Sequence, residues 1–439
     1  MTPDKPEVGR PQPGPGLSRR DLLRWGAVGG VAAGANLLRQ PGAAAAPMSA
    51  LSGQGTDGPS GPDGASERTL LSAQKASFDG DYQLLILSEP APATTVVAFD
   101  VTVSSRSELR SLLQELTARM RALYAGGAEG FDGPGAPPAD SGILGPVVPA
   151  SSVGFIFGIG ASLFDQRFGL AASRPPGLLP MEPFPNDDLD PAQTEGDLCL
   201  QICADQPDVV VHALRDITRH TSGAMQPRWR LDAFKSPPRP SGTPRNLMGF
   251  KDGTANPTTS SPTQMADLVW VQGSSGAPEW AVGGTYMVVR IIKIFVESWD
   301  RLLLGDQERV IGRRKGTGSP LGANGEFAAF DYSADPSGAV TPHTAHIRLA
   351  NPRTVPSEPS RILRRSYNYD RGLDSNGDLD QGLLFTCFQQ DILKQFITVQ
   401  ARLINEPMAQ FISPVGGGYF FCSPGLGGRT SSYFGNGLV

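Results

Sequence analysis

The sequence predicts an α+β fold made of two similar halves, each a ferredoxin-like unit of antiparallel strands and helices. Runs rich in β-branched residues are followed by segments whose apolar residues recur at helical spacing. The order strand, helix, strands, helix, strand occurs in both halves, and a proline-rich connection at 237–244 separates them. We therefore expect duplicated ferredoxin-like units that pack through their sheets, with peripheral helices, as in a dimeric α+β barrel.

The first half supplies its elements in that order. Residues 94–103, TTVVAFDVTV, are β-branched and predict a strand, and 108–124 place apolar residues three and four apart, which predicts a helix. Residues 126–141 are rich in Gly, Pro and Ala and predict a surface loop. The other elements predicted here are strands at 152–158, 197–204 and 228–234 and a helix at 207–220.

The second half repeats the pattern with different residues. GTYMVVRIIKIFV at 284–296 predicts a long strand, and 297–304 predicts the opening of a helix. Residues 382–389 predict another strand, and 391–403 predict a helix. The repetition is one of pattern and not of residue identity.

The N-terminal residues are expected to direct export. Ser18-Arg19-Arg20-Asp21-Leu22-Leu23 precedes an apolar run at 25–38 and small residues at 43–46, the order of a twin-arginine signal peptide; an ordinary secretory signal is the alternative. The apolar run is shorter than the roughly 20 residues that span hydrocarbon, so no stable transmembrane segment is expected. The expected location is periplasmic, cell-envelope or extracellular. The expected segments are a signal peptide at 1–46, a flexible linker at 47–72, an N-terminal ferredoxin-like half at 73–236 and a C-terminal half with the functional site at 237–439.

Composition and motifs exclude several classes of function. The net charge of −5 and the lack of a long basic tract argue against nucleic-acid binding. The four cysteines form neither CxxC nor CxxCH, which excludes covalent c-type haem and zinc ribbons, and apolar surroundings predict buried, inert thiols for most of them. The sequence also lacks a GxSxG elbow and a GxxxxGK[ST] phosphate loop.

Three short segments carry the residues suited to chemistry. GFKDGTANP presents Asp252 between glycines that allow a tight turn, and RILRRSY supplies closely spaced arginines able to stabilise negative charge. The third segment, TPHTAHIRLANPR at 341–353, contains His343 and His346, three residues apart. Packing or a helix end accounts for the other two histidines, His212 and His220. Each segment alone is compatible with an ordinary turn or a solvated basic face.

Together, these segments resemble the dye-decolourising peroxidase family, in particular its exported, deferrochelatase-like branch. GFKDGTANP, QERVIGRRKGTGSPLG, AHIRLANPR, RILRRSY, LLFTCFQQD and EPMAQFISPVGGGYFF occur in family order from about residue 95 to the C-terminus. The resemblance implies haem b as the cofactor, with His346 as the iron ligand, Asp252 as the distal acid and Arg364 as the distal arginine. It further implies that haem is lined by Gly253, Thr254, Ala255, Asn351, Pro352 and Arg353.

The resemblance leaves several points open. His343 is a rival imidazole, and Ser366 stands where many relatives have glycine. A carboxylate that accepts the second N–H of His346 would strengthen its donation to iron, and Glu406 and Asp391 are the candidates. Bulky donors would need surface aromatic residues as electron relays. Tyr367, Tyr369, Tyr419 and Trp299 are considered for this role, but each is more typical of a core or an interface and none is assigned it.

The sequence is compatible with three functions. The first is a peroxidase that uses hydrogen peroxide to oxidise dyes, phenolics or similar small-molecule reductants. The second is removal of iron from haem, without opening the macrocycle, for the transport proteins of an iron-uptake system. The third is a haem-free binding protein of chlorite-dismutase-like or ferredoxin-like architecture. A homodimer is among the assemblies that the resemblance implies.

Overall fold

A computed structural model describes residues 77–439 except 128–132, 151 and 330. The expected signal peptide and linker therefore lie outside the described residues. In the part of the chain that is described, no helix is both long and apolar enough to cross a membrane.

The first half is a β-α-β-β-α-β unit, as the sequence predicts. Helix α2 begins with a capping box, in which Ser105 accepts from the Glu108 backbone N–H and the Glu108 carboxylate accepts from Ser105 N. The bounds are β1 Ala93–Val101, α2 Arg106–Ala125, β2 Val153–Gly160, β3 Leu198–Ala204, α3 Pro207–His220 and β4 Met225–Phe234.

The second half repeats this topology with longer insertions between its elements. The predicted helix at 297–304 is wrong in extent, because the chain turns after Trp299, whose buried indole N–H donates to Met248 O at 3.0 Å. The helix predicted at 391–403 begins with a π-helical turn, Leu393–Ile397. The bounds are α4 Pro262–Leu268, β5 Thr285–Ile294, α5 Val296–Trp299, α6 Leu304–Ile311, α7 His346–Ala350, β6 Leu363–Arg364, β7 Tyr367–Leu373, β8 Leu379–Gln389, α8 Thr398–Leu403 and β9 Ile412–Cys422.

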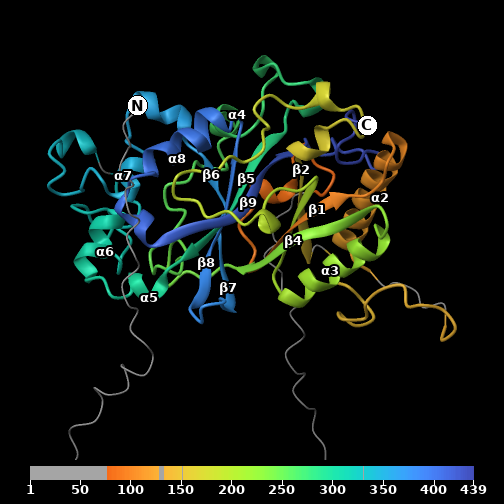
Figure 1. Ribbon diagram of the computed structural model, residues 1–439, viewed down its shortest axis with the longest axis horizontal. Coiled ribbons are helices and arrows are strands. Elements are labelled where there is room, and N and C mark those ends of the chain that lie inside the picture. The colour runs from red at the N-terminus through yellow and green to blue at the C-terminus, as the bar shows by residue number, and fades with distance from the viewer. Residues whose placement is uncertain (1–76, 128–132, 151, 330) are drawn as a thin grey trace, which may run out of the picture. The chain divides into compact units, whose positions relative to one another are not determined.

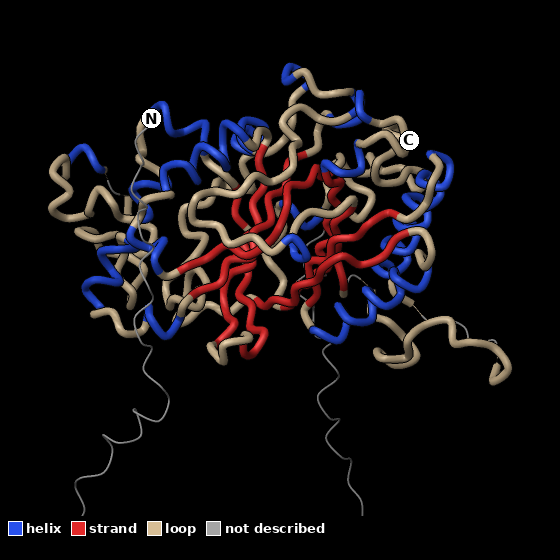
Figure 2. The backbone as a smooth tube through the Cα atoms, in the orientation of Figure 1, coloured by secondary structure: helices blue, strands red, loops and turns tan. Residues whose placement is uncertain are grey.

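The strands form one antiparallel sheet that closes on itself. Its order is β5-β9-β2-β3-β1-β4-β7-β8, and β8 pairs with β5 from Tyr286↔Gln389 to Lys293↔Gly382. Each half contributes four neighbouring strands in ferredoxin-like order, β4-β1-β3-β2 and β7-β8-β5-β9. The strands gather centrally and the helices lie around them, with α2 and α3 on the side away from α7 and α8 (Figures 1 and 2). The expected duplicated α+β fold is thus confirmed.

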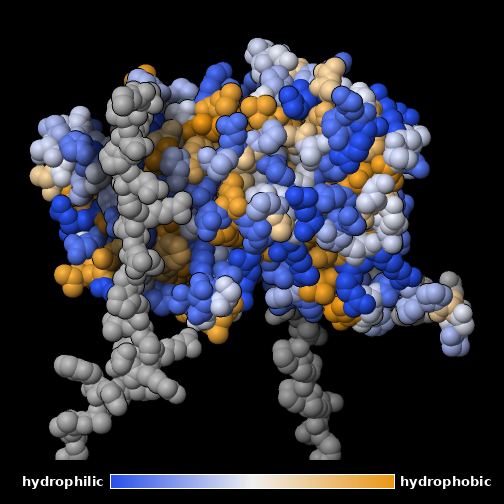
Figure 3. Space-filling model, viewed as in Figure 1, coloured by the Kyte–Doolittle hydropathy of each residue, from blue (hydrophilic) through white to orange (hydrophobic). Residues whose placement is uncertain are grey.

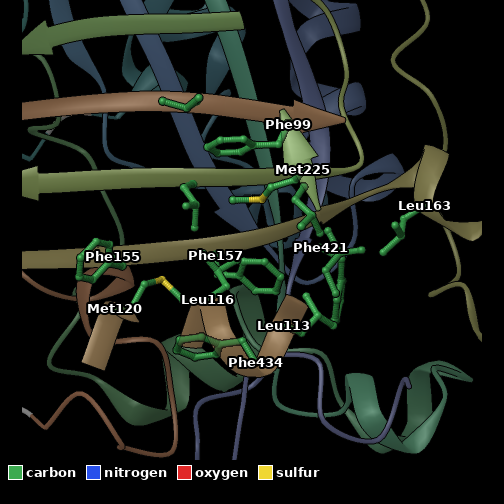
Figure 4. Packing of buried hydrophobic residues seen from close by; sticks show 14 of the residues in the cluster. Phe99, Leu113, Leu116, Met120, Phe155, Phe157, Leu163, Met225, Phe421 and Phe434 are labelled. Carbon is green, nitrogen blue, oxygen red and sulfur yellow. The ribbon is translucent and has the colours of Figure 1, made fainter. Parts of the chain in front are cut away.

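The core joins the two halves. Phe157 of β2 and Phe421 of β9 are both fully buried in one cluster with Leu113, Leu116 and other residues of α2 (Figure 4). Full burial of each such side chain stabilises the fold by roughly 1.5–3 kcal/mol. On the viewed surface, polar and apolar residues are interspersed (Figure 3). The four cysteines are free and buried, which agrees with the burial expected for Cys203, Cys387 and Cys422.

Candidate active site

His346 is the first residue of α7 and lies on a cavity in the C-terminal half. Its Nδ1 is 2.7 Å from Oε2 of Glu406, and the side chain of Glu406 is only 4% exposed. Glu406 stands between α8 and a short 3-10 turn at Pro407–Gln410, and its backbone N–H donates to Leu403 O. The end of α8 therefore fixes the carboxylate that orients the imidazole, and Nε2 is left as the nitrogen that Glu406 does not engage.

The partner carboxylate also sets the charge preference of His346. Burial by itself lowers the pKa of this imidazole, but the negative charge of Glu406 and its hydrogen bond raise the pKa above the ordinary value of 6.5. A buried carboxylate that accepts from one imidazole nitrogen makes the other nitrogen a better donor to a metal. Of the two carboxylates considered from the sequence, Asp391 instead accepts from the backbone N–H groups of Leu393 and Lys394.

Asp252 and Arg364 form an ion pair in the same cavity. Arg364 Nη1 is 2.9 Å from Asp252 Oδ1, and both side chains are partly buried. Asp252 lies in the loop before α4, where Gly249 and Gly253 both have positive φ, as the tight turn predicted from GFKDG requires. Arg364 ends the short strand β6, so two segments more than 100 residues apart meet here.

Asn256 fixes these two segments to each other. Its side-chain amide donates to Arg364 O at 2.7 Å, and its Oδ1 accepts from Arg364 N at 3.2 Å. The amide thus imitates a pair of strand hydrogen bonds between the Asp252 loop and β6. Asn256 belongs to the motif GFKDGTANP, but its role is not apparent from sequence because its partner, Arg364, is distant in the chain.

The cavity brings together most of the predicted site residues. Pro352 is a neighbour of lining residues but does not line the cavity itself, and His343 does not line it either. Phe385 of β8 and Ile292 of β5 belong to the apolar part of its wall. The predicted residues that line the cavity are Asp252, Gly253, Thr254, Ala255, His346, Asn351, Arg353 and Arg364.

Arg353 has a backbone conformation that residues other than glycine seldom adopt. Its φ is 56°, and its N–H donates to Asn351 Oδ1 at 2.9 Å. A left-handed conformation costs a non-glycine residue roughly 1–3 kcal/mol and is most often retained at functional sites. Arg313, which in sequence stands only within the motif QERVIGRRKGTGSPLG, is 6% exposed and lines the same cavity. The cavity therefore carries guanidinium groups suited to anionic substituents of a ligand.

His212 and His220 have hydrogen-bond partners outside the cavity. The Nδ1 of His212 is 2.8 Å from Ser141 Oγ, and the Nδ1 of His220 is 2.9 Å from Asp216 O. Both side chains belong to α3, in the other half of the chain. The packing roles expected for these two histidines agree with their positions.

The aromatic residues considered as surface relays are not on the surface. Trp299 and Tyr369 are fully buried, and Tyr367 and Tyr419 are 1% and 3% exposed. This burial agrees with the interpretation of all four as core residues and argues against a surface relay role for them. All four rings belong to the hydrophobic clusters of the protein core.

The donor set of the cavity suits a haem. Among the described residues, no group of three or more His, Cys, Asp or Glu side chains is arranged to hold a metal ion. A single imidazole with an apolar wall and nearby guanidinium groups instead matches an iron that brings a porphyrin and its carboxylates with it. The ion pair of Asp252 and Arg364 adds a proton acceptor and a fixed positive charge in the same space.

Comparisons with protein families and curated proteins agree with this chemistry. The model of the N-terminal domain of Dyp-type peroxidases matches residues 83–235, and the model of the C-terminal domain matches residues 243–426. A deferrochelatase of Escherichia coli strain K12 is 46% identical over 371 residues, which cover 83% of this chain and 88% of that protein. A deferrochelatase of Shigella boydii shows the same identity and coverage.

Solved structures show the same fold. Ferric DtpA from Streptomyces lividans has a TM-score of 0.73 at 34% identity and covers 83% of this chain and 96% of its own. A DyP-type peroxidase from Cellulomonas bogoriensis has a TM-score of 0.72 at 35% identity and covers 83% and 97%. The chain therefore belongs to the Dyp-type peroxidase family and is a haem peroxidase.

Proposed function

We propose that this enzyme uses hydrogen peroxide to oxidise dyes, phenolics or similar one-electron donors, with haem b held by His346. The observation that carries the proposal is one cavity that contains both the His346–Glu406 pair and the Asp252–Arg364 pair. Peroxide cleavage needs an electron-donating axial ligand on iron and a proton-transfer group beside the bound peroxide. The two pairs supply these functions.

The residues of the cavity would hold the haem in distinct ways. Nε2 of His346 would ligate iron while Nδ1–H donates to Glu406. Gly253, Thr254 and Ala255 would lie along the macrocycle, and so would Asn351 and its neighbour Pro352. The guanidinium of Arg353 would bind a propionate, because it is a planar donor matched to a carboxylate.

Asp252 and Arg364 would act on the peroxide. When bound, haem supplies the iron at which the O–O bond is broken. The Asp252 carboxylate accepts the proton from one peroxide oxygen and delivers it to the other, which leaves as water. The fixed charge of Arg364 stabilises the negative charge that develops on the leaving oxygen. The ion pair keeps the two groups within 2.9 Å of each other before peroxide arrives.

A second candidate is removal of iron from haem, with transfer of the iron to an uptake system. The 46% identity to proteins named deferrochelatase favours it. The same cavity would bind incoming haem, and the protein would release iron and an intact porphyrin.

One experiment separates the two candidates. Purified protein is supplied with haem and then with hydrogen peroxide and a phenolic dye, while dye absorbance, free iron and protoporphyrin fluorescence are followed. The peroxidase proposal predicts peroxide-dependent loss of dye absorbance with haem retained. Accumulation of metal-free protoporphyrin without dye oxidation would instead support iron removal.

We also propose export by the twin-arginine route to the periplasm, the cell envelope or the exterior. The Arg19-Arg20 pair before Leu22 and Leu23 supports this proposal. Changing Arg19 and Arg20 to lysine should leave haem-loaded enzyme in the cytoplasm. Continued export of that variant would show that another route is used.

A further inference from the structure

The loop of Asp252 is held from outside the cavity by the carboxylate of Glu326. Oε1 of Glu326 accepts from Thr243 N at 3.0 Å and from Thr254 Oγ1 at 3.2 Å, and Oε2 forms an ion pair with Lys251 Nζ. Lys251 immediately precedes Asp252, and Thr254 follows it by two residues. One buried carboxylate, 8% exposed, therefore contacts both sides of the segment that presents the proposed distal acid.

Lys251 is confined by its surroundings. Its side chain is 5% exposed, and Nζ also donates to Ser241 O at 2.6 Å. The alkyl chain passes over Gly318, which has φ +77° and where a Cβ would lie 2.5 Å from Lys251 Cδ. A larger residue at position 318 would therefore clash with the alkyl chain that carries the ammonium group to Glu326.

The segment that carries Glu326 is tied to the cavity wall. Nη1 of Arg313 donates to Glu326 O at 3.0 Å and to Gly318 O at 2.6 Å, and Arg313 lines the cavity. Lys251 and Thr254 also line it. Residues 313–326 thus connect the wall of the cavity, through Arg313, to the Asp252 loop, through Glu326.

The charge of Glu326 bears on the pairing of Asp252. Lys251 places a buried positive charge one residue from Asp252, and a buried charge requires a partner. Asp252 already pairs with Arg364, and the nearby Lys235 and His346 also interact electrostatically with it. With Glu326 neutralised, Lys251 would be an additional cation competing for the Asp252 carboxylate.

We propose that Glu326 is a positioning residue for Asp252, which fixes the loop on both sides and keeps Lys251 paired away from the distal carboxylate. The inference rests on the proposed function of Asp252 in proton transfer. It assigns to Glu326 no contact with peroxide or haem. Its effect is on the geometry and charge surroundings of the residue that does act on peroxide.

The test compares haem-loaded, full-length Glu326→Gln with Lys251→Gln and the double variant. Two quantities are measured on ferric enzyme at one pH: the second-order rate of reaction with hydrogen peroxide and the dissociation constant of cyanide, whose binding as an anion requires a distal proton acceptor. Haem content per protein is measured alongside. Asp216→Asn is the control for loss of a buried ion pair, because Asp216 pairs with Arg119 between α2 and α3 and does not line the cavity.

The inference predicts that Glu326→Gln slows the peroxide reaction about tenfold or more and weakens cyanide binding, with haem content unchanged, since small displacements of a catalytic group are costly. The double variant should recover part of the loss, because the unpaired cation is gone. A peroxide rate and cyanide affinity within twofold of wild type would overturn the inference. A loss of peroxide rate that is fully accounted for by a loss of haem would also overturn the inference. For the control Asp216→Asn, any change in rate is expected to follow haem content in this way.

Two further variants keep the test decisive. If Glu326→Gln does not accumulate, Glu326→Asp retains the charge but shortens the reach. The peroxide rate of that variant must then fall and its cyanide dissociation constant must rise for the inference to stand. Asp252→Asn tests the proposed function of Asp252 separately from the positioning role of Glu326. If it leaves the peroxide rate unchanged, the proposed function of Asp252 fails; if it slows the reaction and neither Glu326 variant does, only the positioning role is overturned.

Discussion

Replacement of Glu406 by glutamine tests how the protein tunes the proposed iron ligand. The Glu406 carboxylate lies 2.7 Å from His346 Nδ1, and the side chain of Glu406 is 4% exposed, so this carboxylate is largely shielded from solvent. Glutamine keeps a hydrogen-bond acceptor of nearly the same shape but removes the charge. Loss of such a partner typically weakens metal affinity by about 10- to 100-fold, which corresponds to about 1.4–2.7 kcal/mol. We expect the lower end of this range, because the amide oxygen can still accept from the imidazole.

The assay is titration of apoprotein with haemin, followed by the Soret band and by the potential of the ferric–ferrous couple. The potential should rise in Glu406→Gln, because a less basic imidazole stabilises ferric iron less well. Asp391→Asn is the matched control, since Asp391 accepts from the backbone at Leu393 and Lys394 and not from His346. Wild-type affinity and an unchanged potential in Glu406→Gln would refute the reasoning.

Other perturbations separate proton transfer, haem binding and stability. Asp252→Asn should slow the reaction with peroxide by about 10²–10⁴-fold in rapid mixing while haem content is kept, because the amide cannot accept the proton; an unchanged rate would contradict this role. Arg364→Leu should slow the same step by about 10²–10³-fold, and retention of the wild-type rate would show that its charge is not used. Arg353→Gly and Arg353→Ala should both weaken haem binding, but the glycine apoprotein should be more stable in urea by about 0.5–1 kcal/mol, since φ is 56° at this position; equal stability would argue against backbone strain. In the apoprotein the pKa of His346 is raised, so the stabilisation from its charged pair with Glu406 is complete below pH 6.5 and is lost as pH rises through the raised pKa. The difference in unfolding free energy between wild type and Glu406→Gln should therefore shrink with rising pH, and a difference that grows would contradict the assignment.

The strands and helices that sequence patterns predict are those with clear local signals. The helix predicted at 207–220 coincides with α3 in both bounds, because Pro207 opens it and basic residues close it. By contrast, β9 contains Pro414 and three consecutive glycines, Gly416–Gly418, which locally favour turns. It forms a strand because β5 and β2 pair with it on either side, a tertiary effect that local patterns do not carry.

The site residues likewise fall into those that local sequence motifs identify and those that depend on contacts distant in the chain. His346, Asp252 and Arg364 stand in distinctive motifs, and Glu406 was one of two carboxylates considered. The place of Arg313 in the cavity wall was not predictable, because in sequence it resembles the neighbouring Arg314. In the structure Arg313 is 6% exposed, whereas the side chain of Arg314 is 57% exposed. The contacts of Glu326 likewise depend on residues 72 to 83 positions away.

The most direct test of the central claim compares the haem content and optical spectra of His346→Ala and His343→Ala, expressed with ample haem and purified side by side. His346 lines the cavity and pairs with Glu406, whereas His343 lies outside the lining. Loss of haem from His346→Ala, with full occupancy and an unaltered Soret band in His343→Ala, is the result expected. Full haem occupancy and an unchanged spectrum in His346→Ala would contradict the proposed ligand.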